Sequence, residues 1–380
     1  MKHLVPSDEH IMLQDSARQF LQANCPVSAF RHLRDNSVSP CYSRQHWKQI
    51  CDLGWSGIIL PEEYGGLDFG YVGLGAIMKE SGRTLLASPL FASVCLGAQY
   101  LLRAGSDTQK RDILPSVVCG DTCLALAIEE GPHHDPLATL FTAQPDGGNF
   151  VLNGTKTFVV DGQCANYFLV VARTSGKPGD AKGLSVFLVD IDRKGVERKQ
   201  LHLLDARDYS SVDFDNVIVG EDDLVGSMND AWRYLEPTLD AARILLAAEM
   251  LGGICECFER TVEYLRDREQ FGVKIGSFQA LRHRAAHLFA EIELCKAVVD
   301  TGLAALDGAP GSISVLASLA KARLNDIALL ATNEAVQMHG GIGVTDELDI
   351  GLFLKRARVA IQILGDSSYH RDRFGRLNGY

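Results

Sequence analysis

The spacing of hydrophobic and polar positions changes twice along the chain and divides it into three regions. From residue 8 to about residue 120, apolar side chains such as Ile11, Phe20 and Leu21 recur at helical spacing between polar faces. The segment 60–66 interrupts this pattern as a turn, and helices resume from about Tyr71. We therefore expect residues 1–120 to form an N-terminal helical domain.

The middle of the chain consists of short apolar or alternating runs separated by turn residues. The predicted strands are 123–128, 149–152, 157–160, 167–172, 184–189 and 211–214. The predicted turns, all containing glycine, are 146–149, 153–154, 161–162 and 175–179. Residues 121–228 are therefore expected to form a β-domain, either a barrel or a sandwich.

Long helical stretches return after Asp230. They are predicted at 232–268, 278–306, 313–339 and 347–363, with clusters of Gly and Pro at 308–311 and of Gly at 340–343. Residues 229–380 are therefore expected to form a C-terminal helical domain. The order helical, β, helical predicts the α+β class.

Composition and charge restrict the classes of partner. The chain has 380 residues, 46% of them hydrophobic, which is enough for a large core and shows no signature of disorder. Its net charge of −11 repels nucleic-acid phosphates and anionic membrane surfaces, so neither is an expected partner. The uncharged run 85–102 is broken by polar residues and is predicted to be a buried helix. The N-terminus has no apolar signal-peptide core, and a cytoplasmic protein is expected.

No segment reads as a metal site. The ten cysteines have no regular spacing, which is typical of reduced, buried thiols. Cys255 and Cys257 form the one tight pair, and packing explains it better than zinc. The sequence His133-His134-Asp135 lies beside Pro132 and is interpreted as a surface turn.

Three segments have residue types suited to a phosphate-bearing, aromatic cofactor, although each has a simpler interpretation. No phosphate loop or glycine fingerprint of a dinucleotide fold is present. In 266–272, Arg268 and Phe271 at a helix end could bind a pyrophosphate and stack a base, or form a solvated helix end. The glycines of 337–343 could admit a ligand to the backbone, or end a helix. Phe158 could lie against a flat cofactor, or in the core.

Taken together and in order, six segments give the whole chain a resemblance to the acyl-CoA dehydrogenase family of flavoproteins. They are Leu-Pro-Glu-Glu-Tyr-Gly-Gly at 60–66, Leu-Ala-Ile-Glu-Glu at 126–130, Gly-Thr-Lys-Thr-Phe at 154–158, Leu-Asp-x-x-Arg at 239–243, Asp-Arg-x-Gln-Phe-Gly at 267–272 and Gln-x-His-Gly-Gly-x-Gly at 337–343. The resemblance implies an N-terminal helical domain, a middle β-domain and a C-terminal four-helix bundle.

The resemblance also implies FAD, an acyl-CoA substrate and an oligomer. FAD would lie between the β-domain of one subunit and helices of another, so the chain would form a homodimer or tetramer, or a heterotetramer with a paralogous subunit. An electron-transferring flavoprotein is the expected electron acceptor. The implied cofactor-binding residues are Phe158 at the isoalloxazine, Arg268, Phe271 and Gln279 at the pyrophosphate and adenosine, and Gln337, Gly340 and Gly341 on the adenosine side. Arg243 corresponds to a family arginine near the acyl site.

The chain departs from the family pattern at three places. Val160 stands where the family has a hydroxyl-bearing residue that faces the flavin. The loop 128–135 differs from the family's Thr-Glu-Pro-x-x-Gly-Ser-Asp sequence. The catalytic glutamate is missing, because Gly365 and Ala242 stand at its two usual positions.

Asp366 is the one carboxylate in the tail segment 363–368 and is the candidate base that would take the substrate α-proton. The alternative is a turn aspartate that accepts from the backbone N–H of Ser367 or Ser368. The resemblance leaves three functions open. They are acyl-CoA dehydrogenation by one subunit type of a heteromeric enzyme, a non-catalytic subunit that completes the FAD site of a paralogue, and flavin-dependent oxidase or monooxygenase chemistry.

Overall fold

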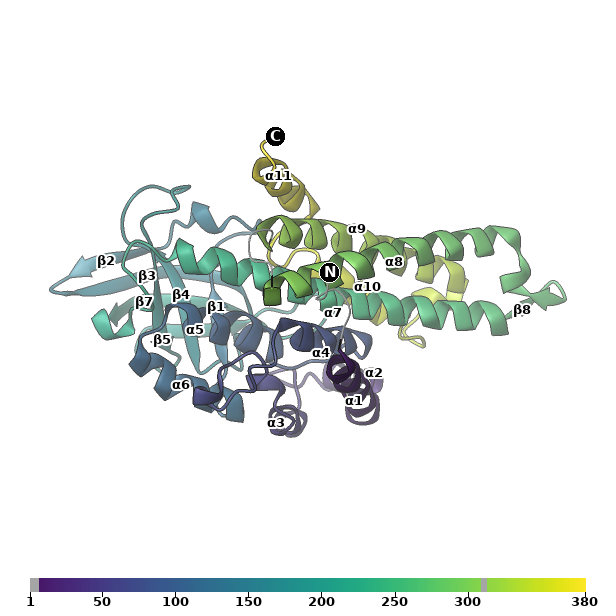
Figure 1. Ribbon diagram of the computed structural model, residues 1–380, viewed down its shortest axis with the longest axis horizontal. Coiled ribbons are helices and arrows are strands. Elements are labelled where there is room, and N and C mark those ends of the chain that lie inside the picture. The colour runs from purple at the N-terminus through teal and green to yellow at the C-terminus, as the bar shows by residue number, and fades with distance from the viewer. Residues whose placement is uncertain (1–6, 309–312) are drawn as a thin grey trace. The chain divides into compact units, whose positions relative to one another are not determined.

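The computed structural model describes residues 7–308 and 313–380 (Figure 1). The chain forms two compact units. The helical unit comprises 1–31, 71–86 and 243–380, and the sheet unit comprises 32–70 and 87–242. Part of the N-terminal stretch considered for a signal peptide, residues 1–6, and most of the predicted Gly and Pro cluster at 308–311 lie outside the described residues.

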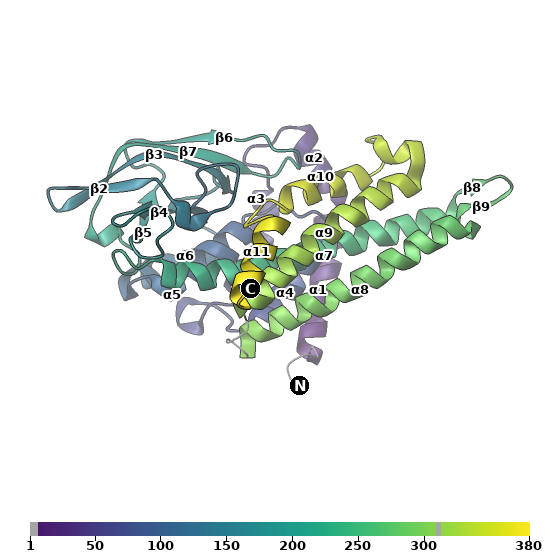
Figure 2. The ribbon, with the colours of Figure 1, turned by 90° about the horizontal axis from the view of Figure 1, so that it is seen from above.

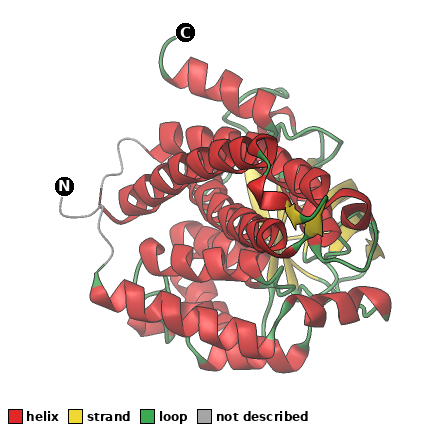
Figure 3. Ribbon diagram, turned by 90° about the vertical axis from the view of Figure 1, so that its right-hand side faces the viewer, coloured by secondary structure: helices red, strands yellow, loops and turns green. Residues whose placement is uncertain are grey.

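The helical unit is built from long helices, red in Figure 3, and one small hairpin. Its helices are α1 (Asp8–Asn24), α4 (Tyr71–Arg83), α8 (Gln279–Gly308), α9 (Ile313–His339), α10 (Ile350–Ala360), α11 (Ser367–Leu377), most of α7 (Trp232–Asp267) and the first half of α2 (Val27–Asp35). Strands β8 (Glu269–Gln270) and β9 (Val273–Lys274) form the hairpin between α7 and α8. The Ser7 hydroxyl begins α1 by accepting the backbone N–H of His10.

The sheet unit contains one seven-stranded sheet with helices before it. The helices are α3 (Arg44–Asp52), α5 (Gln99–Ala104), α6 (Asp107–Cys119) and a π-helix at Phe91–Ala98. The strands are β1 (Leu124–Ala127), β2 (Thr142–Asp146), β3 (Asn149–Val160), β4 (Tyr167–Arg173), β5 (Leu184–Asp190), β6 (Val196–Gln200) and β7 (Tyr209–Val219). Their order is β1-β4-β2-β3-β7-β6, with β5 on β4. Figure 2 labels strands β2 to β7 of this sheet. The core of the sheet includes Phe141, Phe168, Phe187 and Phe214.

The α+β class and its order of helical, β and helical regions are confirmed, and several local predictions are wrong. Strand β3 runs through the predicted turn 153–154, because Gly154 takes φ +131° at an irregular register with β7 instead of reversing the chain. Strands β2 and β6 were not predicted, since neither shows apolar alternation: β2 is mostly exposed, and β6 alternates between half-buried and exposed residues that are mostly polar. The predicted helix 347–363 stops at Ala360, and the tail adds α11.

The buried run 85–102 contains the π-helix and the start of α5, so the predicted buried helix is confirmed in a less regular form. Every residue from Leu85 to Leu101 is buried. Among the described helices, none is both long enough and apolar enough to cross a membrane.

Two glycines allow α4 and α7 to touch through their backbones. A Cβ on Gly82 would lie 1.8 Å from the carbonyl oxygen of Glu249, and a Cβ on Gly252 would lie 1.7 Å from that of Lys79. The neighbouring Gly253 is different, because its Cβ would meet nothing nearer than 3.4 Å. The crossing therefore requires glycine at two of these three positions.

We expect Gly82→Ala to lower the free energy of unfolding by about 1–3 kcal/mol, because the new methyl group forces the two backbones apart. Gly253→Ala is the matched control, and its helix propensity should leave stability unchanged or raise it by up to about 1 kcal/mol. Urea unfolding of both variants measures the difference. Equal stability of the two variants would contradict a backbone contact at Gly82.

Candidate functional site

The segment 361–366 between α10 and α11, called here the tail loop, has an unusual backbone. Leu364 has φ +57° and Gly365 has φ +112°, so two successive residues adopt positive φ. A Cβ on Gly365 would lie 2.6 Å from Cδ1 of Tyr369 and 2.8 Å from Nε2 of His370. The loop is therefore built around a residue without a side chain, and a glutamate at this position would need the loop to rearrange.

Asp366 begins α11 as its N-cap. Its Oδ1 accepts the backbone N–H of Tyr369 at 2.8 Å. The acceptor role predicted for a turn aspartate is therefore present, but the donor is Tyr369 and not Ser367 or Ser368. The side chain is half-buried, and the described residues provide no hydrogen bond to its Oδ2. The role of Asp366 as a base stays a prediction.

Arg243 lies against the tail loop and is fully buried. Its Nε donates to the carbonyl oxygen of Leu364 at 3.2 Å, and its Nη2 donates to the hydroxyl of Tyr369 at 3.3 Å. The guanidinium carbon lies 5.5 Å from the centre of the Tyr369 ring. The structure thus brings the predicted residues Arg243 and Asp366 to the same segment, where Arg243 holds the backbone.

The sequence interpretation missed a second buried cation at this loop. Lys321 on α9 is fully buried, and its Nζ contacts four carbonyl or amide oxygens of the helical unit. Burial lowers the pKa of Lys321 well below its ordinary value, and the charge of Arg243 lowers it further while Asp366 opposes the shift. A signal existed, because Lys321 follows the buried Ala317 and Ala320 on a core-facing stripe where a charge is rare.

A second group of predicted residues lies where α7, the hairpin and α8 meet. Arg268 is exposed, and among the described residues its guanidinium has no hydrogen-bond or ion-pair partner. Phe271 at the hairpin tip is 92% exposed with φ +53°, and its ring lies 6.2 Å from that of Phe278. Gln279 is the exposed first residue of α8. This end of the unit offers a cation and a ring to a ligand outside the chain.

The predicted residues at the end of α9 belong to the same end of the helical unit. Gln337 is exposed, and a Cβ on Gly340 or Gly341 would meet nothing within 4 Å. Their helix is joined to the hairpin by a small apolar cluster of Leu265, Ile275 and Met338. In addition, the hydroxyl of Tyr264 donates to the carbonyl oxygen of His339 at 3.3 Å. This end of the helical unit therefore brings together open glycine backbone, the exposed ring of Phe271 and a guanidinium for which the described residues provide no partner.

The sheet unit carries the two residues predicted at the flavin ring. Phe158 near the end of β3 is 39% exposed and has φ +50°, so part of its ring is open to contact. Val160 two residues later is 8% exposed. Phe158 can therefore serve as an apolar wall, while Val160 packs mainly within its own unit.

Contacts to Lys156 and Glu129 give the loop 128–135 a defined shape. The fully buried Lys156 donates to the carboxylate of Glu130 at 2.6 Å and to the carbonyl oxygen of Ile128 at 3.2 Å. Burial lowers the pKa of Lys156 to about 8, and the charge of Glu130 opposes this shift. The surface-turn interpretation is wrong for His134, because its side chain is 2% exposed and its Nδ1 lies 2.5 Å from the carboxylate of Glu129.

The turn 161–164, which directly follows Val160, is tied to Asp208. The backbone N–H of Asp161 donates to the carbonyl oxygen of Asp208 at 3.0 Å, and that of Gln163 donates to its Oδ2 at 3.1 Å. Asp208 is 2% exposed. Burial raises its pKa to about 6, although the N–H groups of the turn and the charges of Arg198 and Arg207 oppose the shift.

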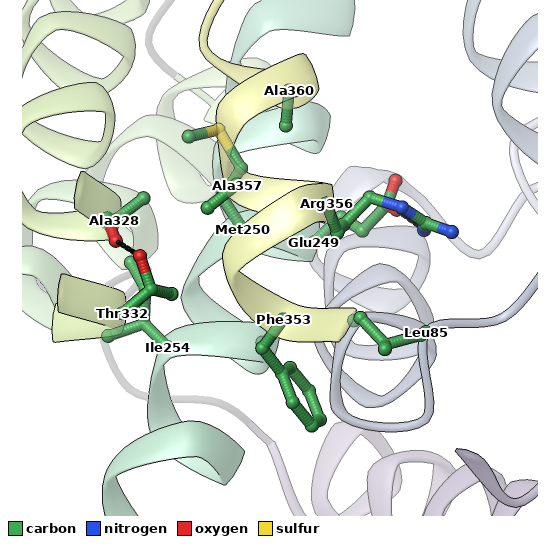
Figure 4. A pocket seen from close by; sticks show the side chains of 12 residues that line it. Leu85, Glu249, Met250, Ile254, Ala328, Thr332, Phe353, Arg356, Ala357 and Ala360 are labelled. Atoms are coloured by element: carbon green, nitrogen blue, oxygen red, sulfur yellow. Dashed lines mark hydrogen bonds and ion pairs between the residues drawn. The ribbon is translucent and has the colours of Figure 1, made fainter. Parts of the chain in front are cut away.

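A small cavity lies within the helical unit between α4, α7, α9 and α10 (Figure 4). Its volume is about 30 Å³, room for about one water molecule. Arg356 and Glu249 face each other at its wall, with Arg356 Nη1 3.3 Å from Glu249 Oε1 (Figure 4). On the other side, the hydroxyl of Thr332 donates to the carbonyl oxygen of Ala328. The cavity is too small for an acyl group. Among the described residues, no group of three or more His, Cys, Asp or Glu side chains is placed to hold a metal ion.

Comparison with known proteins covers almost the whole chain. Profiles of the N-terminal, middle and C-terminal domains of acyl-CoA dehydrogenases match residues 7–121, 125–217 and 229–377. The mitochondrial 2-methylacyl-CoA dehydrogenase of Solanum tuberosum is 30% identical over 98% of this chain and 91% of its own length.

Two solved structures resemble this chain over nearly its whole length. One is named as a complex of two proteins, and the other is named as a steroid acyl-CoA dehydrogenase. The ChsE4-ChsE5 complex of Mycobacterium tuberculosis matches with a TM-score of 0.88 and 26% identity over 99% of both chains. A variant of the steroid acyl-CoA dehydrogenase Tcur3481-Tcur3483 matches with a TM-score of 0.87 and 29% identity over 98% of both chains.

The buried carboxyl of Asp208 should make stability depend on pH. Its folded-state pKa of about 6 lies above the unfolded value of about 3.9, so its stabilising contribution is complete at acid pH and is lost as the pH rises through 6. We expect Asp208→Asn, which keeps an acceptor for Gln163, to be more stable than the wild type by about 3 kcal/mol at pH 7.5 and by about 1 kcal/mol or less at pH 4.5. Thermal and urea unfolding across this range measure both values.

Asp213→Asn is a control in which the expected change in stability at neutral pH has the opposite sign. Hydrogen bonds from Lys199 and Thr155 lower the pKa of Asp213, so its contribution exists at neutral pH and is lost as the pH falls. Its loss should cost less than about 1 kcal/mol at pH 7.5 because the ion pair is partly exposed. If both variants shift stability in the same direction at pH 7.5, burial does not dominate at Asp208.

Proposed function

Since this chain belongs to the acyl-CoA dehydrogenase family, we propose that it is one subunit type of a heteromeric, FAD-dependent enzyme that dehydrogenates an acyl-CoA thioester between its α- and β-carbons. The observation that carries the heteromeric part is the packing at Gly365. A subunit that supplies its own glutamate needs space for a side chain there. This chain has filled that space with Tyr369 and His370.

The reaction requires a carboxylate that removes the α-proton, and bound FAD supplies the acceptor for the β-hydride. Within this chain Asp366 is the candidate for the proton, and its Oδ2 is the oxygen that would accept it. Asp366 is shorter than glutamate by one carbon–carbon bond, roughly 1.5 Å. Arg243 and Lys321 hold the backbone that precedes Asp366, and this backbone would have to place the Asp366 carboxylate close to the substrate. If it does not, a partner chain must supply the base.

FAD would be held by groups from two subunits. Arg268, whose guanidinium has no partner among the described residues, would bind the pyrophosphate, and Phe271 and Gln279 would contact the adenosine. Gly340 and Gly341, together with Gln337, would let the adenosine side approach the backbone. Phe158 of another subunit would cover the isoalloxazine face. An electron-transferring flavoprotein as acceptor and a cytoplasmic location complete the proposal.

We expect Arg268→Ala to weaken FAD binding by about ten- to hundredfold, because it removes a charge-assisted hydrogen bond of about 1.5–3 kcal/mol. Arg266→Ala is the matched control, since Arg266 is exposed two residues earlier and lies outside the proposed contact. Titration of the apoprotein with FAD, followed by flavin fluorescence, measures both affinities. Equal affinities in the two variants would remove Arg268 from the cofactor site.

We expect Asp366→Asn to slow flavin reduction by an acyl-CoA by about 10²–10⁴-fold while FAD and acyl-CoA still bind. Asn is as good an N-cap as Asp, so α11 should stay in place. Asp366→Ala, which loses the cap as well, should also lose about 1 kcal/mol of stability. Anaerobic mixing with butyryl-CoA and isovaleryl-CoA, with and without a co-encoded paralogue, gives the rates. A near-normal rate in Asp366→Asn would place the base on another residue or chain.

A further inference from the structure

The end of α10 leaves backbone carbonyl groups that need donors, and the core of the helical unit supplies them. The N–H groups of Ile361 and Gln362 reach the carbonyl oxygens of Ala357 and Val359. Beyond these, the chain leaves the helix and turns its carbonyl groups inward. Four of the carbonyl oxygens from 360 to 365 are then held by side chains of α7, α9 and α11.

Lys321 contacts three of these four oxygens. Its Nζ lies 2.9 Å from the carbonyl oxygen of Ala360, 3.4 Å from that of Ile361 and 3.3 Å from that of Gly365. It also lies 2.7 Å from Oδ1 of Asn325, whose Nδ2 donates to the same Gly365 oxygen at 3.3 Å. The fourth oxygen, of Leu364, accepts from Arg243 and His370.

Burying the amino group of Lys321 costs free energy, because it loses its hydration. All four oxygens around Nζ are neutral, so no carboxylate at hydrogen-bond distance offsets the loss of hydration. Lys321 is not needed to attach α11 to α9, because other side chains join these two helices. Asp326 accepts from Ser367 and Arg371, and Arg373 donates to Ser318 and to the carbonyl oxygen of Ser314.

We propose that Lys321 is a positioning residue, which fixes the backbone of the tail loop and thereby sets the place of the Asp366 carboxylate relative to the acyl-CoA. Its amino group donates to the carbonyl groups at the C-terminus of α10 and holds Gly365 in the positive-φ conformation that precedes Asp366. The catalytic part of this inference rests on the proposed function, whereas the structural part does not.

The test uses Lys321→Met in the full-length, FAD-loaded chain. Met has a similar length and no donor, and Arg323→Met is the matched control. Arg323 lies two residues along the same helix and pairs with Glu291 instead of the tail loop. Lys321→Gln, which keeps a neutral donor, is the second variant and decides the question if Lys321→Met does not fold.

Hydrogen–deuterium exchange gives a readout that is independent of activity. In Lys321→Met we expect about tenfold faster exchange at the amides of the tail loop and of Tyr369 and His370, since their hydrogen bonds depend on the loop backbone. Peptides covering 371–380 should keep wild-type exchange because Arg373 and Asp326 still hold α11. Arg323→Met should match the wild type in both regions. Wild-type exchange of the tail loop in Lys321→Met, or in Lys321→Gln if Lys321→Met does not fold, would overturn the inference.

The rate of flavin reduction shows whether Lys321 positions Asp366 or only stabilises the fold. With butyryl-CoA or isovaleryl-CoA, we expect the limiting rate in Lys321→Met to fall by about tenfold or more while the half-saturating concentration changes less than about threefold. An unchanged limiting rate beside a loosened loop would overturn the positioning role. If the wild type reduces flavin with neither acyl-CoA, alone or with its paralogue, the proposed function fails, and the exchange data alone decide the role of Lys321 in the loop.

Discussion

Two buried basic side chains hold the backbone of the tail loop, and the conformation of the candidate catalytic segment depends on these contacts. Arg243 and Lys321 donate to carbonyl oxygens that the end of α10 leaves unpaired. With these oxygens satisfied inside the core, the chain can leave the helix within a few residues, adopt positive φ at Leu364 and Gly365, and begin α11 at Asp366. Without the donors, the same backbone would bury unpaired carbonyl groups, at about 1–3 kcal/mol each.

In the sheet unit, too, a buried lysine donates to a backbone carbonyl group, but a carboxylate lies beside it. Lys156 donates to the carbonyl oxygen of Ile128, as Lys321 does to that of Ala360, but Lys156 also meets the carboxylate of Glu130. The carboxylate limits the effect of burial, so the pKa of Lys156 falls only to about 8, whereas that of Lys321 falls well below its ordinary value. The described residues place only neutral oxygens at hydrogen-bond distance from Nζ of Lys321, so no carboxylate there opposes the effect of its burial.

The surfaces proposed to bind FAD differ from these clusters because their groups lack partners in the described part of the chain. Phe271 extends into solvent, Arg268 has no ion pair, and open space faces Gly340 and Gly341. Exposed aromatic and cationic side chains of this kind contribute little to the stability of the isolated chain. They are consistent with binding energy that arises only when a cofactor and a second subunit cover them.

The sequence alone determined the class of the fold, the limits of the long helices and the family. Helix α9 was predicted at its observed bounds, because its apolar period is long and regular. Strand β3 was divided in two, since an Asn-Gly pair signals a turn locally and only pairing with β7 keeps the strand continuous. Propensity describes neighbours in sequence, whereas sheet pairing joins residues about 60 positions apart.

The candidate site shows the same division. Arg268, Phe271, Gly340 and Asp366 were proposed from the sequence because each belongs to a short local motif. The roles of Lys321 and Tyr369 were not, because they depend on contacts between segments some 40 residues or more than 120 residues apart, such as Lys321 with Ala360 and Tyr369 with Arg243. A lysine in an apolar stripe is visible in the sequence, but only the tertiary structure decides which carbonyl groups it meets. The sequence therefore proposed candidate residues from their chemistry, and the packing of α7, α9 and α11 determined the geometry in which Arg243, Lys321 and Asp366 are held.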